Sequence, residues 1–382
     1  MAPMEEIFIT NISIGSVRNI KNMEIALSEN ERKHLIITGK NGSGKTSLLE
    51  AMRACIFLEV QEPASSPLVR HEFPSPSYKK LGLSIEYSVP IYRTNIIREV
   101  MFAYIAATRR LDLDIPKSIE KIELKYQTHI TARMYPEFLK YILYLNYQLL
   151  AAQNDDDKQR LENWFSNFKQ ALKDIFNCPE LELRHDAKEL TFKIVMPGYE
   201  PFGLNEMADG YSAFLNIVID LLMRMDDGNA IVNYGQSAIV LVDEIETHLH
   251  VELQKKVLPF LTRLFPNVQF IVSTHSPFVI TSLKNAVVFD LEKRERLDNP
   301  TAYSYETIVE AYFDTDMYSE KMNATFERYK ELCFKERSQE ETEEFLKVKA
   351  ELKLVPPAAK ELYHAFRECE EKRKAAGNGK NR

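Results

Sequence analysis

Eight consecutive residues have the types and the spacing of a loop that binds phosphate. Gly39-Lys40-Asn41-Gly42-Ser43-Gly44-Lys45-Thr46 fits the pattern G-x-x-x-x-G-K-[ST]. Glycines let successive backbone N–H groups turn toward phosphate oxygens, and a helix that starts at Lys45 adds its N-terminal dipole. We expect Lys45 to contact the β- and γ-phosphates of ATP and the Thr46 hydroxyl to bind Mg²⁺. The residues assigned to the nucleotide are Gly39, Asn41, Gly42, Ser43, Gly44, Lys45, Thr46 and Ser47.

Two carboxylates follow an apolar run later in the chain. Ile239–Val242 is apolar and rich in β-branched residues, and Asp243 and Glu244 come directly after it. Ligands of α/β sheets bind at the carboxyl ends of the strands. Asp243 is therefore predicted to bind Mg²⁺, directly or through water, and Glu244 to position the attacking water. A strand that ends in two solvated acids gives the same pattern, but a phosphate loop in the same chain favours the catalytic interpretation.

A histidine stands at the end of the next apolar run. Val268–Val272 is followed by Ser273-Thr274-His275-Ser276. A lone histidine is more often structural, but its position after the Asp-Glu pair favours a contact between His275 and the γ-phosphate. The catalytic residues predicted from the sequence are Lys45, Glu244 and His275.

A polar turn at Asn205–Ser212 opens a predicted helix. Phosphate loop, helix-opening turn, Asp-Glu strand and strand-end histidine follow one another as they do in ABC-type ATPases, which the chain resembles. Val17-Arg18-Asn19-Ile20 and Glu246-Thr247-His248-Leu249-His250 are similar to the branch that contains RecF and the "overcoming lysogenization defect" (OLD) proteins. The resemblance covers residues 4–60 and 200–290.

The resemblance implies that two ATPase heads dimerise and that a turn of one head caps the nucleotide of the other. Here this signature turn is Met207, Ala208, Asp209, Gly210 and Tyr211. Ala208 stands where the family has a serine whose hydroxyl meets the γ-phosphate, which puts the hydrolysis rate in question more than nucleotide binding. Arg18 matches an arginine that lies near the nucleotide in this branch, although a solvated loop arginine is an open alternative.

Strands and helices of an α/β fold must position these residues. Strands are predicted at Ile7–Ile14, Met23–Leu27, Leu35–Ile37, Leu81–Ser88, Met101–Ala107, Leu181–Arg184, Leu190–Val195, Ala238–Val242, Val268–Val272 and Val287–Phe289. Helical spacing is predicted from Thr46, over most of Ile115–Phe176, from Tyr211, and over Leu253–Phe265, Lys321–Leu354 and Ala358–Lys372. The fold class is therefore α/β: an ABC-type P-loop NTPase head, a mixed sheet with flanking helices, that carries a helical insertion and a helical C-terminal region.

This organisation divides the chain into five parts. We assign 1–110 and 179–295 to the two parts of the head, 111–178 to the helical insertion, 296–372 to the helical C-terminal region and 373–382 to a disordered tail. The stretch Lys321–Leu354 mixes charges of both signs, as a solvated face does, and an effector-docking surface is the alternative.

Length and composition limit the classes of protein. The 382 residues carry 49 Lys and Arg against 56 Asp and Glu, a net charge of −7, which excludes binding to nucleic acid by bulk positive charge. The four cysteines are far apart, no apolar run reaches the ~20 residues of a membrane span, and the first residues do not form a signal peptide. We therefore expect a cytoplasmic chain that makes no membrane contact.

Three other patterns have competing interpretations. His248 and His250 have the residue types of a metal pair, but they lie in a loop after the Asp-Glu strand and match the D-loop region of the ABC-type family that the chain resembles. Asp314 and Asp316 are comparable to the acids of Toprim nucleases, yet helix caps are favoured because the surrounding sequence is helical. The basic stretch at Arg109-Arg110 and Lys117–Lys125 is the candidate DNA-binding lining of a RecF-like repair ATPase, the alternative function given below.

The whole layout resembles the stand-alone ATPases of the PARIS, Septu and retron-associated anti-phage systems. That resemblance implies an ATPase that forms a dimer of heads or a larger homo-oligomer, and slow hydrolysis would be compatible with Ala208 in the signature turn. The ATPase would hold a separate effector, a nuclease or toxin encoded nearby, until a phage-encoded trigger releases it. The alternative is a RecF-like repair ATPase that binds DNA, and an ATP-hydrolysing transporter subunit ranks last.

Overall fold

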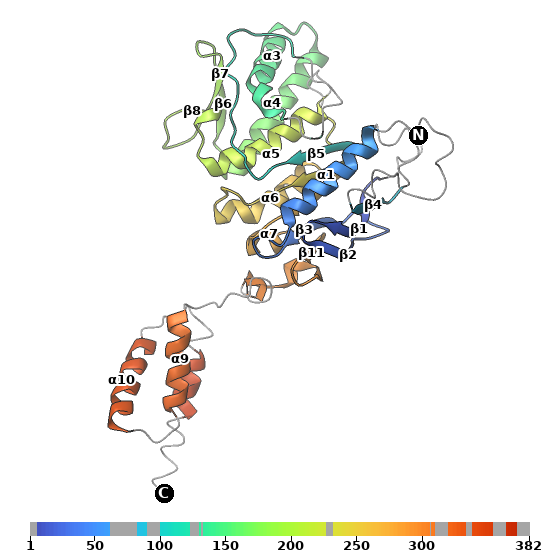
Figure 1. Cartoon of the computed structure of the whole chain (residues 1–382). Coiled ribbons are helices and arrows are strands. Elements are labelled where there is room, and N and C mark those ends of the chain that lie inside the picture. The colour runs from blue at the N-terminus through green and yellow to red at the C-terminus, as the bar shows by residue number, and fades with distance from the viewer. Residues whose placement is uncertain are drawn as a thin grey trace, which may run out of the picture. The chain divides into compact units, whose positions relative to one another are not determined.

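The computed structural model describes residues 6–61, 82–89, 100–122, 130, 133–226, 232–305, 307–309, 320–333, 338–353 and 364–372. The chain divides into two compact units, Met1–Ile308 and Val309–Arg382 (Figure 1). The predicted loop at Pro63–Ser77, the two aspartates Asp314 and Asp316 and the predicted disordered tail 373–382 lie outside the described residues.

A six-stranded sheet forms the centre of the first unit, in the order β12-β11-β3-β10-β9-β5. Its strands are β3 (His34–Thr38), β5 (Met101–Ile105), β9 (Ala238–Val242), β10 (Val268–Ser273), β11 (Ala286–Asp290) and β12 (Glu295–Asp298). Five strands run parallel and β12 pairs antiparallel with β11. Residues of β3, β9, β10 and β11 are buried at every position, which accounts for their apolar runs. Because parallel strands end at one edge, the loops that follow β3, β10, β9 and β5 begin next to one another.

A smaller antiparallel sheet packs against the first helix. It contains β2 (Ile20–Ala26), β1 (Ile9–Val17) and β4 (Leu83–Tyr87), in that order. One side of α1 (Lys45–Gln61) is apolar, and Leu48, Leu49 and Met52 are fully buried in a core that includes residues of both sheets. Helix α1 is therefore held between the two sheets (Figure 1). This packing fixes the orientation of the helix, whose N-terminus lies at the loop after β3.

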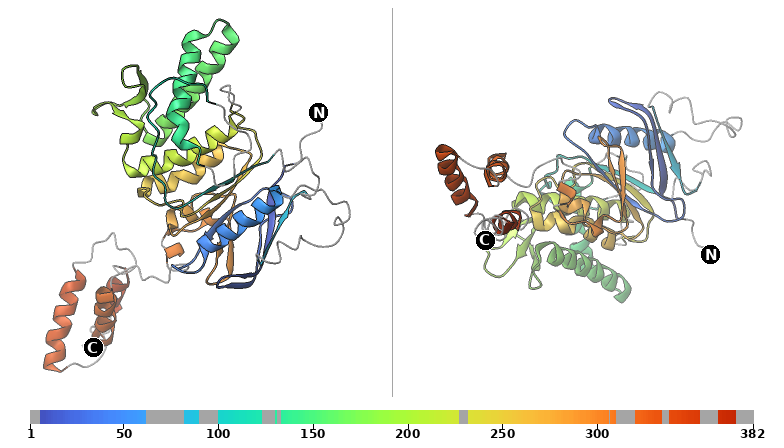
Figure 2. Two further views of the ribbon diagram at one scale, coloured as in Figure 1. Left: turned by 45° about the horizontal axis from the view of Figure 1, so that its top comes forward. Right: turned by 90° about the horizontal axis from the view of Figure 1, so that it is seen from below.

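Helices and a hairpin form the middle of the chain. Helices α3 (Phe138–Ala151) and α4 (Asp155–Phe176) lie side by side, preceded by η1 (Tyr135–Glu137) (Figure 2). Trp164 of α4 packs against Phe138, Tyr141 and Phe168 in their shared core. The antiparallel strands β6 (Glu182–Asp186), β7 (Thr191–Val195) and β8 (Phe202–Gly203) follow, and η2 (Leu204–Glu206) leads into α5 (Asp209–Met225).

Short connections complete the first unit, and the second unit is helical. Helix α6 (Val251–Leu264) joins β9 to β10, α7 (Pro277–Ile280) follows β10, and η3 (Pro300–Ala302) follows β12. The second unit contains α9 (Glu320–Cys333), α10 (Gln339–Lys353) and a helical stretch at 364–372. Tyr329, Phe345 and Phe366 meet in its separate apolar core.

The predicted α/β class is confirmed, and the structure corrects three details. Residues 115–122 are not helical, although the sequence places them in a mostly helical stretch. Pro116 disfavours a helix here, and the N–H of Asp114 bonds to Pro136 O instead of a helical partner. The first hairpin is longer than predicted and turns at Arg18 and Asn19 rather than over 15–22. The predicted boundary at residue 295 falls at the start of β12, which pairs with β11 and so belongs to the first unit.

Candidate functional site

The loop after β3 has the backbone shape of an anion cradle. Gly39, Gly42 and Gly44 have φ angles of 133°, 83° and 105°, which residues with a Cβ atom rarely adopt. α1 begins at Lys45, so its first N–H groups face the loop. Ser43 Oγ is buried and has no hydrogen-bond partner among the described residues, although buried hydroxyls are normally satisfied. An anion in the loop would supply that partner.

Lys45 is buried beneath the loop. Its side chain is 6% exposed, and Nζ donates hydrogen bonds to Gly39 O at 2.8 Å and to Lys40 O at 3.2 Å. Burial lowers the pKa of the Lys45 ammonium below its usual range, while nearby carboxylates, led by Glu244, oppose the shift. The two carbonyls hold the amino group inside the loop, where it can reach phosphate oxygens.

Oxygen atoms converge between the N-terminus of α1 and the end of β9. Thr46 Oγ1 donates to Asp243 Oδ1 at 3.2 Å, and Ser273 Oγ donates to the same carboxylate oxygen at 2.6 Å. Asp243 is 3% exposed. A hydroxyl beside a buried carboxylate is the kind of oxygen donor set that Mg²⁺ prefers. The residues assigned to Mg²⁺ from the sequence, Thr46 and Asp243, are thus in hydrogen-bond contact although 197 positions separate them.

Glu244 is held in an unusual backbone conformation. Its φ is 45°, in the left-handed region that a residue with a side chain occupies at a cost of about 1 kcal/mol or more. Ser273 Oγ accepts its backbone N–H at 2.7 Å, and Thr247 Oγ1 donates to its Oε2 at 3.2 Å. These contacts fix the direction in which the Glu244 side chain points from the end of β9.

Arg109, in the segment after β5, binds the backbone of Asp243 and Glu244. Its guanidinium donates to the backbone oxygens of Asp243 and Glu244, at 2.6 Å each, and to Ala106 O at 3.0 Å. Burial lowers the pKa of Arg109 to about 10, against the attraction of Glu246 and Asp243. The sequence suggested Arg109 as part of a basic stretch for DNA; its 4% exposure corrects this, because a buried guanidinium cannot contact a phosphate backbone.

His275 follows β10 and is half buried. Its backbone N–H donates to the Glu246 carboxylate. Burial and the positive charge of Lys45 lower the pKa of His275 below its usual value, so its ring is neutral near neutral pH. Burial raises the pKa of Glu246 above its usual range. Because β10 and β3 are parallel neighbours, His275 follows the same edge of the sheet as the phosphate loop.

The tip of the first hairpin touches the phosphate loop through Asn19 rather than Arg18. Asn19 Nδ2 donates to Gly42 O at 3.1 Å and to Ser43 O at 3.2 Å. A Cβ atom on Gly44 would lie 2.9 Å from Ile20 Cδ1, so the hairpin packs directly on the loop. Arg18 is 71% exposed and pairs with Glu50 on α1 at 3.3 Å. The structure thus leaves open both interpretations of Arg18.

The signature turn forms the N-terminus of α5. Ala208 is the N-cap, and its methyl side chain cannot accept a hydrogen bond from the helix. A Cβ atom on Gly210 would lie 2.9 Å from His248 O, and the Tyr211 ring stacks on Phe176 with centroids 4.2 Å apart. Met207 is buried, and Asp209 is exposed. Within one chain Gly210 therefore approaches the loop after Glu244 and Tyr211 stacks on α4, which places the start of α5 near the carboxylate strand.

Three side chains that contact the assigned residues were not predicted from the sequence. Asn19, Arg109 and Ser273 each contact an assigned residue from a distant part of the chain. Ser273 has a signal, since it begins the Ser-Thr-His segment at a strand end. Arg109 has none, because its role depends on β5 lying beside β9.

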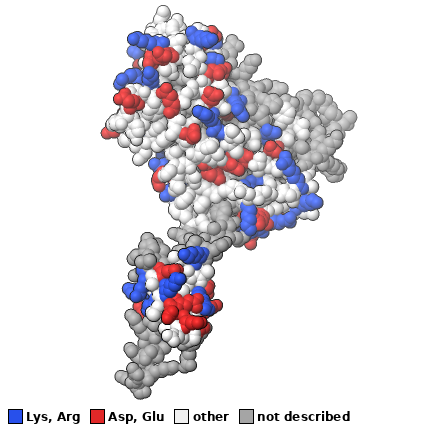
Figure 3. Space-filling view, turned by 60° about the vertical axis from the view of Figure 1, so that its left-hand side comes forward, with Lys and Arg blue, Asp and Glu red and all other residues white. Residues whose placement is uncertain are grey.

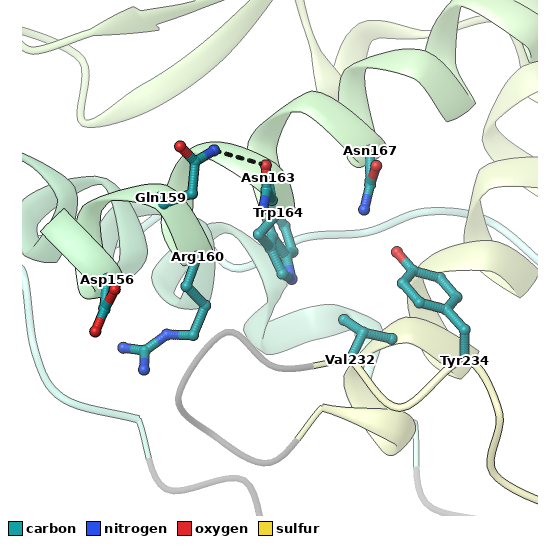
Figure 4. A pocket seen from close by; sticks show the side chains of 8 residues that line it. All are labelled: Asp156, Gln159, Arg160, Asn163, Trp164, Asn167, Val232 and Tyr234. Carbon is teal, nitrogen blue, oxygen red and sulfur yellow. Dashed lines mark hydrogen bonds between the residues drawn. The ribbon is translucent and has the colours of Figure 1, made fainter.

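Other features of the described chain bear on the alternative interpretations. His248 and His250 are both exposed, and the described residues contain no group of three or more side chains that could hold a metal ion. A pocket of about 470 Å³ between α4 and Val232 and Tyr234 is lined by none of the assigned residues (Figure 4).

On the face shown in Figure 3, Lys and Arg side chains are interspersed with Asp and Glu. No helix in the described ranges has the length and apolar character of a membrane span.

A family model described as "AAA domain, putative AbiEii toxin, Type IV TA system" matches residues 102–281. This range contains the Asp-Glu strand, the signature turn and His275 and begins after the phosphate loop.

Two relatives match longer parts of the chain. "Septu protein PtuA" of Bacillus mycoides (strain KBAB4) is 25% identical over 344 residues, which is 84% of this chain and 47% of that protein. "Retron Vc95 probable ATPase" of Vibrio cholerae serotype O1 biovar El Tor is 26% identical over 211 residues, 51% of this chain and 40% of that protein. The chain spans less than half the length of either relative. The resemblance to the ATPases of Septu and retron systems is thereby confirmed.

Two further matches are shorter or more distant. "DNA replication and repair protein RecF" of Rickettsia prowazekii (strain Madrid E) is 41% identical over 49 residues, 13% of each chain. A solved structure, "Crystal structure of the SmcHead bound to the C-winged helix domain of ScpA", covers 78% of this chain and 100% of its own, with 15% identity and a TM-score of 0.43.

Proposed function

We propose that this chain binds and hydrolyses ATP as the ATPase subunit of a bacterial anti-phage defence complex. The observation that carries the ATPase part is the contact of Thr46 with Asp243 at the mouth of the phosphate loop, next to the buried Lys45. The similarity to Septu PtuA over 84% of the chain supports the defence role.

In the proposed reaction each side chain has one task. Backbone N–H groups of the loop and Lys45 bind the β- and γ-phosphates, and Thr46 and Asp243 would hold Mg²⁺, which supplies charge neutralisation between these phosphates. Glu244 orients a water molecule and accepts its proton. His275, neutral near pH 7, donates a hydrogen bond toward the γ-phosphate.

We further propose that two heads associate around ATP, with Met207–Tyr211 of one head over the nucleotide of the other. The N-cap Ala208 has no side-chain acceptor for the first N–H groups of α5, so these groups are available to an anion. The second unit, or another surface of the assembly, would hold a separate effector, a nuclease or toxin encoded nearby, until a phage-encoded trigger releases it.

Turnover and complex formation test this proposal together. The purified chain should release phosphate from ATP in Mg²⁺ and lose this activity in excess chelator. Co-expression with the product of the neighbouring gene should yield a complex that elutes as one species. Absence of Mg²⁺-dependent turnover would refute the ATPase role, and separate elution of the two proteins would refute the effector-holding role.

A RecF-like DNA-binding function is the second candidate, favoured by the RecF match over 49 residues. Of the predicted basic stretch, Arg110, Lys117 and Lys121 are exposed, so a smaller basic surface remains. Duplex or junction DNA that stimulates turnover at low salt, with the stimulation lost as salt rises, would support this function instead.

A further inference from the structure

The backbone of Glu244 is restrained from both sides. Ser273 Oγ accepts its N–H at 2.7 Å, and the Arg109 guanidinium binds its carbonyl oxygen at 2.6 Å. Left-handed residues persist where surrounding contacts over-determine them, and such positions cluster at functional sites. Loss of either contact would let Glu244 relax to a common backbone conformation and turn its carboxylate away.

Arg109 is suited to this task by its shape and its burial. Its terminal nitrogens reach the carbonyls of Ala106, Asp243 and Glu244, so one planar group joins the end of β5 to the end of β9. The surrounding carboxylates, led by that of Glu246, compensate the buried charge. Lysine has one nitrogen at the end of a flexible stem and cannot reproduce this fork.

The residues after Arg109 are attached to the signature helix. Leu111 N–H donates to Ser212 Oγ at 2.8 Å in a buried contact, and Asn216 Nδ2 donates to Arg110 O at 3.4 Å. Just before α5, Asn205 bonds to both the N–H and the carbonyl of Leu113, at 3.0 Å each. Residues 106–114 are therefore fixed to Asp243 and Glu244 at one end and to α5 at the other.

We propose that Arg109 is a positioning residue for Glu244 and that segment 106–114 couples the position of α5 to the orientation of the Glu244 carboxylate. The inference rests on the proposed ATPase function, in which Glu244 acts on water. It adds that a displacement of α5 changes turnover in the same chain through Ser212, Leu111 and Arg109. Nucleotide binding, which depends on the loop and Lys45, is not affected.

The test compares Arg109→Lys and Ser212→Ala with the wild-type chain and with Arg263→Lys. Arg263 on α6 is exposed and pairs with Asp174 on α4 at 2.6 Å, outside segment 106–114, so Arg263→Lys is the matched control. ATP affinity is measured in Mg²⁺ by a fluorescent analogue, and turnover by phosphate release at saturating ATP. The double variant of Arg109 and Ser212 completes the cycle.

We expect Arg109→Lys and Ser212→Ala to lower turnover by about 10- to 100-fold, the loss typical of residues that orient a catalytic group. ATP affinity should stay within about twofold in all variants, and the double variant should lose less than the product of the single losses. The control should behave as the wild type does.

Other outcomes overturn the inference in distinguishable ways. Wild-type turnover in Arg109→Lys, or an equal loss of affinity and turnover there, contradicts the positioning role. Normal turnover in Ser212→Ala, or independent losses in the double variant, contradicts the coupling through segment 106–114. A wild-type chain that does not hydrolyse ATP refutes the proposed function itself, and the inference with it.

Discussion

At the scale of single residues, four parallel strands bring their C-terminal residues together. β3 leads to the phosphate loop, β10 to Ser273 and His275, β9 to Asp243 and Glu244, and β5 to Arg109. The first three strand ends could be predicted because each has its own local pattern: glycines, paired acids, a strand-end histidine. Arg109 and Asn19 could not, because their partners are backbone oxygens of distant segments.

Lys45→Ala should weaken ATP binding by at least about 100-fold. A charge-assisted contact contributes about 1.5–3 kcal/mol, and the Lys45 ammonium is expected to meet two phosphates. The measurement is titration calorimetry with ATP and Mg²⁺. The control is Lys40→Ala, which removes a neighbouring loop lysine whose side chain pairs with the half-exposed Glu292 at 3.2 Å. Equal affinity of Lys45→Ala and wild type would contradict the phosphate-loop assignment.

Among the secondary-structure elements, the periodicity of apolar residues predicted the positions of strands and helices more accurately than it predicted where they begin and end. Ala238–Val242 was predicted to the residue, because a fully buried parallel strand is apolar throughout. The residues of 115–122 were misassigned, because the apolar Ile115 and Ile119 have helical spacing yet are exposed at 69% and 42% in a non-helical segment. Their pattern carries no information about the hydrogen bonds by which the N–H groups of Leu113 and Asp114 reach distant residues just before this segment.

Ala208→Ser should have two separable effects on α5. A serine at this N-cap can accept a helical N–H, which stabilises the chain without nucleotide by about 0.5–1 kcal/mol. In the proposed dimer the same hydroxyl would also meet the γ-phosphate held by the other head, so turnover per head should rise. Ala208→Gly is the control, since it lacks the hydroxyl. Thermal unfolding and phosphate release measure the two effects, and unchanged turnover in Ala208→Ser would contradict the role of the turn.

His34 makes the sheet sensitive to acid. Its ring at the start of β3 accepts the Phe270 N–H at 3.1 Å, and burial lowers its pKa to about 4. The unfolded chain, with an ordinary histidine pKa of 6.5, binds this proton more readily between those two values. Stability contributed by neutral His34 is therefore lost as pH falls from 6.5 toward 4, by about 2 kcal/mol between pH 7 and 5.

The variant His34→Asn keeps an acceptor for the Phe270 N–H but does not titrate. Urea unfolding at pH 7 and pH 5 should show a smaller acid-dependent loss of stability in His34→Asn than in the wild type. The same loss in both chains would show that His34 does not cause it.

At the scale of the whole molecule, the assigned site lies in the first unit. Residues from 18 to 275 form it, and the second unit has its own core around Tyr329 and Phe345. The sequence predicted a separate helical C-terminal region from its composition, but it could not show that β12 still belongs to the central sheet, since that depends on pairing with β11.

A chain that ends at Ile308 should therefore fold and bind ATP with an affinity within about twofold of the full chain. Circular dichroism and ATP titration are the measurements. Loss of the complex with the neighbouring gene product, with ATP binding intact, would assign effector contact to the second unit. A truncated chain that folds but does not bind ATP would contradict a site confined to the first unit.

The proposed defence role depends on ATP bringing two heads of this chain together. The mass of the Glu244→Gln chain in solution, measured by light scattering with and without ATP and Mg²⁺, tests this association. Glu244→Gln should bind ATP and fail to hydrolyse it, so we expect a stable dimer or larger assembly that forms only with ATP and Mg²⁺. The same mass in both conditions, in a chain shown to bind ATP, would contradict ATP-driven association of the heads.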